Sequence, residues 1–493
     1  NTPGRSVLRI LPVLSLILPP LVKDPAWILF FSPRTGLVNL ALHNLFGTTW
    51  VFNVFSMAGM ISVAGIFTAP IAYIIMLQPF DSIDRSFLDA SRMSGARLST
   101  SVRKVIIPMI LPALLSATTY GVIVLASSFE TPIIVGLPAH IPTFMSLIYD
   151  VVSSASQGLN IAAAQGSLYL ILTITMVSGY IMATRNERRF VSITGRGHEH
   201  MVLELRGWRW VLAAILLLYA ILAFIGPLVI TVVVAFLPFY SATGGNPFVN
   251  FTLKNFVEVF STPGVAGAIK TSTFIGFFVA GGTVIVAGLL SYVSLKTRYR
   301  FRRAADAISM APIAVPHLVY SLGMLVTVLA TPGLAYFAYG TLGLMIFAEI
   351  IIFLPLAVRL LSSALIQLPD ELIEAAVVSG SSPQRTLRTV VVPIMLPAIL
   401  YAFSVVFILA FRELGSVVLL VAQNTVIVPY QSLTFWISGG YPMLSALNIV
   451  ALMVPLILVA ALFSIRGVIR RVGVVRLPAA EALSVSASKE SMT

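Results

Sequence analysis

The strongest constraint on this fold is a series of apolar segments, each long enough to cross a lipid bilayer. A membrane-spanning helix needs about 20 predominantly apolar residues, and this 493-residue chain is 58% hydrophobic but only 10% charged. Lipid cannot hydrogen-bond an exposed backbone, so each segment must satisfy its own polar groups as a helix. The two-residue alternation of a membrane β-strand is absent. The sequence therefore predicts an all-α polytopic membrane protein.

Ten spanning segments are predicted. They lie at about 9–31, 55–78, 106–136, 161–183, 209–237, 267–295, 304–330, 336–364, 391–421 and 446–466. Prolines within these segments predict kinks. A membrane helix tolerates such kinks because neighbouring helices can satisfy the freed carbonyls. The prolines include Pro19, Pro20, Pro227, Pro355 and Pro397.

Basic residues orient the chain. All but five of the 31 Lys and Arg residues fall in segments that lie on one side of the predicted membrane. The exceptions are Lys23, Arg34, Lys254, Lys270 and Arg412. Cytoplasmic loops carry such an excess of Lys and Arg. The net charge of +13 therefore reflects orientation in a membrane, and we expect no nucleic-acid surface.

Composition also limits the metal chemistry. The chain has no cysteine and five histidines, which excludes disulfides and thiolate metal sites. Only His198 and His200 have ligand-like spacing, and they lie in a polar segment that we interpret as a solvated loop. No metal site is predicted.

One segment occurs twice, at an offset of 285 residues. Nine of the 25 positions in 89–113 are identical to their counterparts in 374–398. Each copy has an acidic residue, small residues, a glycine, a basic stretch and an apolar run opened by proline. We expect short helices at 86–98 and 371–383, with Gly95 and Gly380 permitting sharp turns. Six predicted spans separate the copies, so both lie on the same side and the halves are parallel.

The repeated segment resembles a motif of the permease subunits of binding-protein-dependent ABC importers, Glu-Ala-Ala-x3-Gly-x9-Ile-x-Leu-Pro. The second copy has Glu374-Ala375-Ala376, Gly380 and Val390-x-Val392-Pro393. The first has Asp89-Ala90-Ser91, Gly95 and Val105-x-Ile107-Pro108, which keeps the charge sign and the small size. Two such halves in one chain resemble the fused permeases of ferric-iron importers, with thiamine and aminoethylphosphonate importers as near relatives.

The resemblance implies the type I importer fold, with two pseudo-symmetric halves. The expected organisation is a first half at 1–183, a cytoplasmic linker at 184–207, a second half at 208–466 and a cytoplasmic tail at 467–493. By symmetry with the six spans of the second half, the first half is expected to lack its first two spans.

In that family the repeated loop is a coupling helix that docks a cytoplasmic ATPase dimer. The resemblance assigns this role to Asp89, Ala90, Ser91, Gly95, Glu374, Ala375, Ala376 and Gly380. It also implies a periplasmic or lipid-anchored binding protein, an inner-membrane location and no cofactor on this chain. ATP would be used by the partner, since the chain lacks the Gly-x4-Gly-Lys-Ser/Thr phosphate loop and is not expected to be an enzyme.

Charged residues at membrane depth are the candidates for the translocation pathway. Glu130 lies near the outer end of the span after the first repeat, and Arg412 and Glu413 lie at the corresponding depth in the span after the second. They either line the pathway or form an ion pair that only fixes packing. Lys23-Asp24 interrupt the first span, and Glu349 is a lone acid in another.

Ferric iron is the substrate that the resemblance favours, with thiamine, aminoethylphosphonate or polyamine as alternatives. A different class of protein, a secondary transporter driven by an ion gradient, remains open. A membrane-embedded enzyme has less support because no catalytic cluster is evident.

Overall fold

The computed structural model describes residues 5–81, 83, 85–154, 158–184, 207–240, 251–297 and 299–471. Within these ranges the chain is helical and contains no β-strand. Seven helices are long and apolar enough to cross a membrane, and three sharply bent pairs raise the number to ten. The predicted fold class is confirmed. Most of the predicted linker and tail, with His198 and His200, lies outside the described residues.

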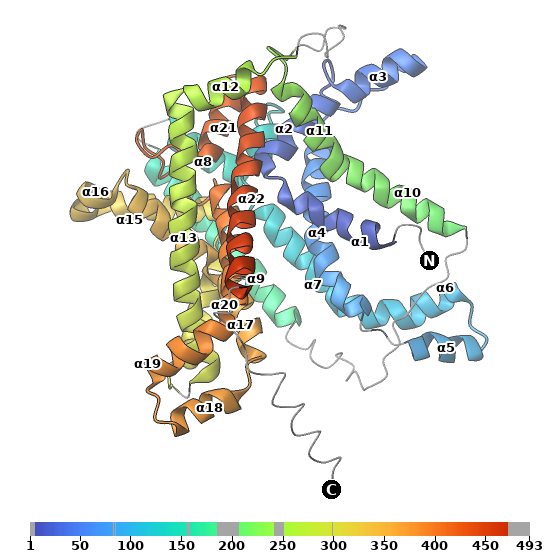
Figure 1. Ribbon diagram of the computed structural model, residues 1–493. Helices are drawn as coiled ribbons and strands as arrows, with labels where there is room; N and C mark the ends of the chain where they lie inside the picture. The colour runs from blue at the N-terminus through green and yellow to red at the C-terminus, as the bar shows by residue number, and fades with distance from the viewer. Residues whose placement is uncertain are drawn as a thin grey trace.

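The spanning elements follow one another in two series (Figure 1). The first comprises α1 (Arg5–Leu14) with α2 (Pro20–Phe31), α4 (Met57–Asp81), α7 (Ile107–Ala126) and α9 (Leu159–Thr184). The second comprises α10 (Trp208–Ala220) with α11 (Gly226–Ala235), α13 (Pro263–Lys296), α14 (Arg302–Met310) with α15 (His317–Ala330), α17 (Leu342–Ile366), α20 (Val392–Phe411) and α22 (Tyr441–Arg471). Shorter helices join them: α3 (Leu37–Phe46), α8 (Phe144–Ser154), α12 (Lys254–Ser261), α16 (Pro332–Ala338) and α21 (Val428–Ile437).

Two spans are broken at corresponding places. The arms Leu8–Ile17 and Pro20–Phe31 meet at 105°, and Arg302–Ala314 and His317–Ala330 meet at 104°. Proline lacks the N–H that would continue the helix and disfavours helical backbone in the residue before it. The break predicted at Pro19–Pro20 is therefore confirmed. Pro355 and Pro397, in contrast, lie inside the continuous helices α17 and α20.

The repeated segments have the same backbone. The first is α5 (Arg85–Met93), α6 (Leu98–Ser101), the π-helical segment η2 (Val102–Ile106) and α7. The second is α18 (Asp370–Val378), α19 (Pro383–Thr386), η8 (Leu387–Val391) and α20, with every boundary displaced by 285 residues. Each predicted single helix is in fact two helices around a glycine turn. Both pairs lie at one end of the molecule, the lower end in Figure 1, which we call the repeat end.

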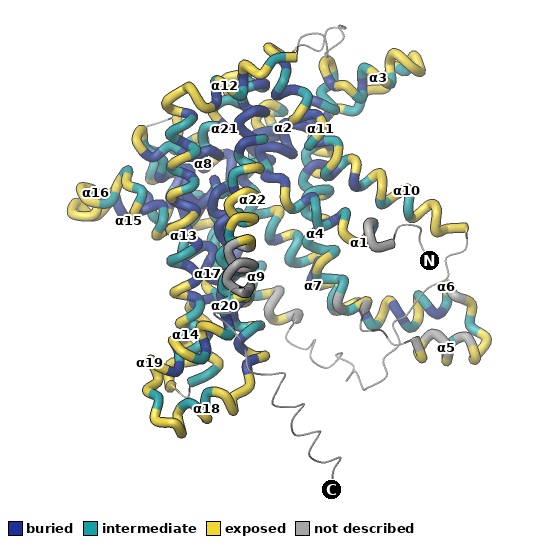
Figure 2. Tube along the Cα trace, viewed as in Figure 1, coloured by how far each residue is buried: buried dark blue, intermediate teal, exposed yellow. Residues whose placement is uncertain are grey.

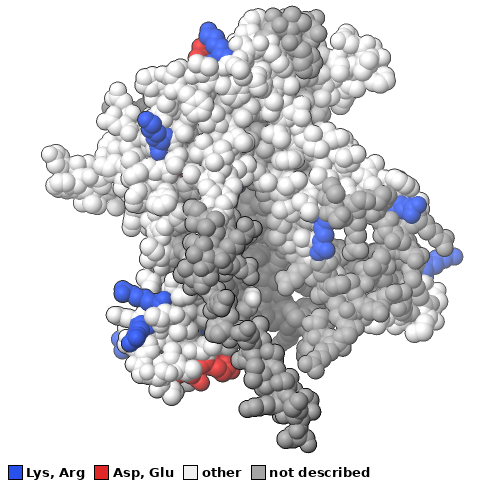
Figure 3. Space-filling model, in the orientation of Figure 1, with Lys and Arg blue, Asp and Glu red and all other residues white. Residues whose placement is uncertain are grey.

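Buried residues lie at the centre of the molecule and exposed ones along the outer faces of the helices (Figure 2). Many of the exposed residues are large and apolar. Large exposed residues such as Leu168, Ile171, Phe277 and Ile285 lie on spanning helices. A water-soluble protein rarely exposes so much apolar surface, whereas lipid covers it without cost. Charged side chains are sparse on the face seen in Figure 3, and the acidic ones lie only near its upper and lower ends.

Residues from both halves share one core. Phe129, Ile134 and Met145 of the first half pack in the same buried cluster as Leu318 and Leu433 of the second. These residues come from α8, α15, α21 and the segment after α7, away from the repeat end. The two halves are therefore joined by apolar packing on the side opposite the repeats.

Candidate functional site

A cavity of about 630 Å³ lies between the two halves. Its walls come from both broken spans, from α4, α7 and α17, and from the residues just beyond the ends of α7 and α20. Seven basic or acidic side chains line it: Lys23, Asp24, Glu130, His317, Arg359, Arg412 and Glu413. A polar cavity inside an apolar helical body is where a membrane protein can place ionisable groups that act on a solute.

Arg412 connects the second half to the first. It follows α20 directly, and its guanidinium Nη1 donates to the carbonyl oxygens of Leu16 at 2.8 Å and Ile17 at 3.2 Å. Those carbonyls lie in the last turn of the first arm of the broken span, where the helix has no further backbone N–H groups to bond them. A cation is favoured at that negative end of the helix dipole. Arg412 thus caps the first arm of the broken span.

Glu413 has a different partner. Its Oε1 lies 2.9 Å from His317 Nδ1 and accepts a 3.0 Å hydrogen bond from the backbone N–H of Ser416. His317 is the first residue of α15, directly after the break in the second bent span. Arg412 and Glu413 are adjacent in sequence but do not pair with each other. No sequence pattern links His317 to these residues, because the contact depends on the bend in the second broken span.

Glu130 lies at the start of the short helical segment between α7 and η3 (Pro132–Gly136), and faces the same cavity half-buried. It interacts electrostatically with Glu413 and His317. Among the described side chains, however, it forms no salt bridge. The three predicted pathway residues therefore line one cavity. Glu130 is the one whose carboxylate is not committed to a partner side chain.

Lys23 and Asp24 are buried beside this cavity, on α2. The Asp24 carboxylate accepts a 2.8 Å hydrogen bond from Thr131 Oγ1. The Lys23 ammonium lies 4.7 Å from the centre of the Phe67 ring, a cation–π contact with α4. Burial of both charges costs less when each has such a contact. The hydrogen bond holds α2 against Thr131, the residue that follows Glu130, and the cation–π contact holds it against α4.

Glu349 lies deeper, on α17, and is 1% exposed. Its Oε2 has no hydrogen-bond partner among the described atoms, and it interacts electrostatically with Glu413. It is one turn from Ile352, which lines the cavity. The lone acid noticed in the sequence therefore lies next to the cavity.

The repeat residues form two exposed surfaces at the repeat end. Ala90, Glu374 and Ala375 are exposed, and Ser91 and Ala376 are half-buried; Asp89 lies within α5. Gly95 and Gly380 have φ values of 78° and 79°. In each copy the N–H after the glycine bonds back to the helix, from Ala96 to Ser91 at 3.1 Å and from Ser381 to Ala376 at 3.0 Å. This is the Schellman ending that a left-handed glycine allows.

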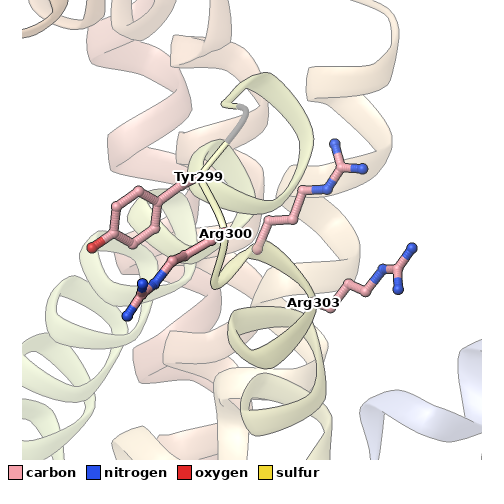
Figure 4. A pocket seen from close by; sticks show the side chains of 4 residues that line it. Tyr299, Arg300 and Arg303 are labelled. Carbon is pink, nitrogen blue, oxygen red and sulfur yellow. The ribbon is translucent and has the colours of Figure 1, made fainter.

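A second concavity, of about 480 Å³, lies in the turn between α13 and α14. It is lined by Tyr299, Arg300, Arg302 and Arg303. In Figure 4 the side chains of Arg300 and Arg303 point to opposite sides of the turn. They do not converge on one ligand, so this concavity is a basic interhelical turn of the kind that the charge bias predicts.

Comparison with known proteins gives a family. Residues 1–192 and 284–473 match the profile of the binding-protein-dependent transport system inner membrane component. A putative ferric transport system permease protein FbpB 1 of Haemophilus influenzae is 24% identical over 85% of this chain and 65% of its own length. A ferric transport system permease protein FbpB of Actinobacillus pleuropneumoniae is 24% identical over 85% of this chain and 59% of its own length.

A probable ABC transporter permease protein y4fN of Sinorhizobium fredii is 26% identical over 82% of this chain and 70% of its own length. The chain thus spans less than two thirds of the length of the two ferric relatives. The family match nevertheless covers more than half of the chain, in both membrane halves. The chain belongs to the family of binding-protein-dependent transport system inner membrane components.

Proposed function

We propose that this chain is the membrane permease of an ABC importer. The observation that carries the proposal is the pair of helix–glycine–helix loops, which have matching boundaries, lie at one end of the molecule and occur in a chain of this family. A duplicated docking element is what a permease needs to engage a dimeric ATPase. The proposed organisation is two halves, 1–183 and 208–466, joined by the linker 184–207 and followed by the tail 467–493.

In this proposal α5 and α18 each dock one ATPase subunit on the cytoplasmic side of the inner membrane. The exposure of Ala90, Glu374, Ala375 and both glycines supports it. Positive-inside bias supports the cytoplasmic placement of the loops and the C-terminus. ATP belongs to the partner, and this chain supplies the helices that respond to ATPase closure.

The proposed path for the substrate is the cavity between the halves, with Glu130, Arg412 and Glu413 on its wall. A periplasmic or lipid-anchored binding protein delivers the substrate at the opposite end. We propose ferric iron as the substrate, because the two relatives described above are named as ferric permeases. Carboxylate oxygens are suitable ligands for a hard cation, and Glu130 and Glu413 supply them.

Reconstitution of the chain with its ATPase and binding protein in proteoliposomes tests this function. Uptake of ferric iron that requires ATP and the binding protein is the expected result. Uptake that persists without the ATPase and follows an ion gradient would instead establish a secondary transporter. ATP-dependent uptake of another solute, without uptake of iron, would support the permease function and refute ferric iron as the substrate.

The pathway assignment is tested by Glu130→Gln and Glu413→Gln in the same assay. Glu130 forms no salt bridge among the described residues, so its neutralisation should lower uptake at a normal level of folded protein. Glu413→Gln disrupts the contact with His317 and should lower the amount of folded protein as well. Normal uptake by the Glu130 variant would remove that residue from the pathway.

A further inference from the structure

A single helix connects the repeat end to the opposite end of the second half. This helix, α13, has 34 residues and runs along one side of the molecule from α12 down to the level of α18 and α19 (Figure 1). It packs along its length on α17 and α20 and also contacts α12, α14 and α21. A helix embedded in so many neighbours moves as a rigid element.

At its repeat end, α13 is bonded to α18 by Lys296. The Lys296 ammonium donates to the Leu368 carbonyl oxygen at 2.7 Å and contacts Asp370 Oδ1 at 2.6 Å. Asp370 opens α18, and Leu368 lies in the turn that precedes it. The Lys296 side chain is 7% exposed. The Asp370 side chain, in contrast, is 74% exposed. The contact therefore joins a shielded ammonium to a solvated carboxylate, and the ammonium depends on the Leu368 carbonyl and on Asp370 in place of water.

α18 has few other attachments, of which the main one outside its loop is Ile373, half-buried against the core of the second half. It contains no buried residue, and among the described elements it packs mainly on α19 and η8, the next two elements of its own loop. The bonds from Lys296 therefore attach the start of α18 directly to a helix outside that loop.

Nearer its other end, nine residues after Pro263, α13 is bonded to α21. Ser272 is 3% exposed, and its Oγ accepts a 2.8 Å hydrogen bond from the backbone N–H of Val428, the first residue of α21. The N-cap residue of α21, Ile427, provides no side-chain cap, so α13 supplies it from outside. Ser272 and Lys296 are separated by about 36 Å along the helix, at 1.5 Å per residue. α21 in turn contributes Leu433 and Trp436 to the core that joins the two halves.

We propose that Lys296 is the positioning residue that attaches α18 to α13, so that α13 transmits displacement of α18 to α21 and to the core between the halves. The inference rests on the proposed docking of an ATPase at α18. Lys296 has no contact with substrate in this scheme. Lys296 determines how much of the displacement of α18 is transmitted through α13 to α21.

The test uses the full chain reconstituted with its ATPase and binding protein, and measures substrate moved per ATP hydrolysed. Lys296→Met keeps the apolar stem and removes the charge. It should lower that ratio by about fivefold or more, the size of a typical coupling between distant sites, while ATP hydrolysis continues. Lys296→Arg should keep most of the coupling. Lys296→Glu should be worse than Met, and Lys296→Glu with Asp370→Lys should recover part of the ratio.

The matched control is Lys254→Met. Lys254 forms a salt bridge of 3.5 Å with Glu258 in α12, at the opposite end, where the two side chains are 73% and 42% exposed. This variant should couple like the wild type. If the wild-type complex shows no ATP-driven uptake, the proposed function itself fails. If it couples and Lys296→Met couples equally well, the role of Lys296 is refuted.

A second measurement needs no transport. The chain has no native cysteine, so spin labels can be placed at Val378→Cys on α18 and Leu289→Cys on α13, where both residues are exposed. In the full chain, Lys296→Met should broaden the distance distribution between the labels, and Lys254→Met should not. An unchanged distribution in the Met variant would overturn the proposal even if uptake is reduced.

Discussion

The two repeated loops share a backbone but are fixed in place by different side chains. In both, an apolar residue before the first helix and two after the second are buried: Ile83, Ile106 and Ile110 in one, Leu368, Val391 and Met395 in the other. In the first loop the Ser91 and Ser101 hydroxyls lie 2.7 Å apart and join α5 to α6. In the second loop the corresponding residues are Ala376 and Thr386, and Thr386 Oγ1 is buried with no hydrogen-bond partner among the described atoms.

The comparison separates the features that both loops share from those that differ between them. Glycine at the left-handed position and the buried apolar residues recur, because the backbone turn and its packing require them. The polar bonds differ, because any contact that holds the helices in place is sufficient. Three experiments test whether the two loops are equivalent.

The largest effect expected is all-or-none labelling. Ser94→Cys and Ser379→Cys, introduced singly, should react with a membrane-impermeant thiol reagent only from the cytoplasmic side. Both residues are exposed at corresponding places after α5 and α18. Ser261→Cys, exposed at the end of α12, serves as a control and should react from the other side. Reaction of either repeat position from outside would mean that the two loops are not equivalent.

Glycine substitution should give the next largest effect. Gly95→Asp and Gly380→Asp each place a charged side chain on an exposed surface where no other atom lies within 4 Å of the new Cβ. The backbone strain is about 1–2 kcal/mol, too little to unfold a protein of ordinary stability. Uptake should therefore fall by about tenfold at normal levels of folded protein, and by similar amounts at the two positions.

The control for these variants is Gly47→Asp. Gly47 has φ 62° and equally open surroundings, but it ends α3, away from the repeat end. It has the same backbone strain without a position in the proposed docking surface, and uptake should be normal. Full uptake by the Gly380 variant would disprove coupling through the second loop.

The smallest effect should be on stability. Thr386→Val removes a buried hydroxyl that has no partner and should stabilise the folded protein by about 1 kcal/mol. Ser101→Ala, at the corresponding position of the first loop, removes a hydrogen bond and should destabilise it by about 1 kcal/mol. Thermal unfolding of the purified protein in detergent measures both. Shifts of the same sign would show that the hydroxyl contacts do not distinguish the two loops.

Much of the fold could be predicted from apolar length and from internal repetition. The predicted spans correspond to the seven continuous and three bent candidates, because the bilayer sets the length of each segment. The break at Pro19–Pro20 could be predicted because proline removes a backbone donor. The division of each repeat into two helices was missed. Positive φ at Gly95 and Gly380 ends the first helix, and sequence alone permits that turn without requiring it.

The candidate site was only partly predictable. The cost of burying charge in lipid singled out Glu130, Arg412 and Glu413, but sequence could not identify their partners. Those partners lie at the breaks of the two bent spans: Leu16 and Ile17 bond Arg412, and His317 bonds Glu413. Arg359, on α17, also lines the cavity, and no local pattern marked it.

Hydropathy, periodicity and backbone freedom along the chain are enough to predict the membrane class, the spans and the duplicated loop with its glycines. The folded arrangement is needed to see which charges meet across the cavity, and that Lys296 contacts Asp370, 74 residues away. Such contacts depend on how separate helices bend and pack, and a linear pattern contains no information about that geometry.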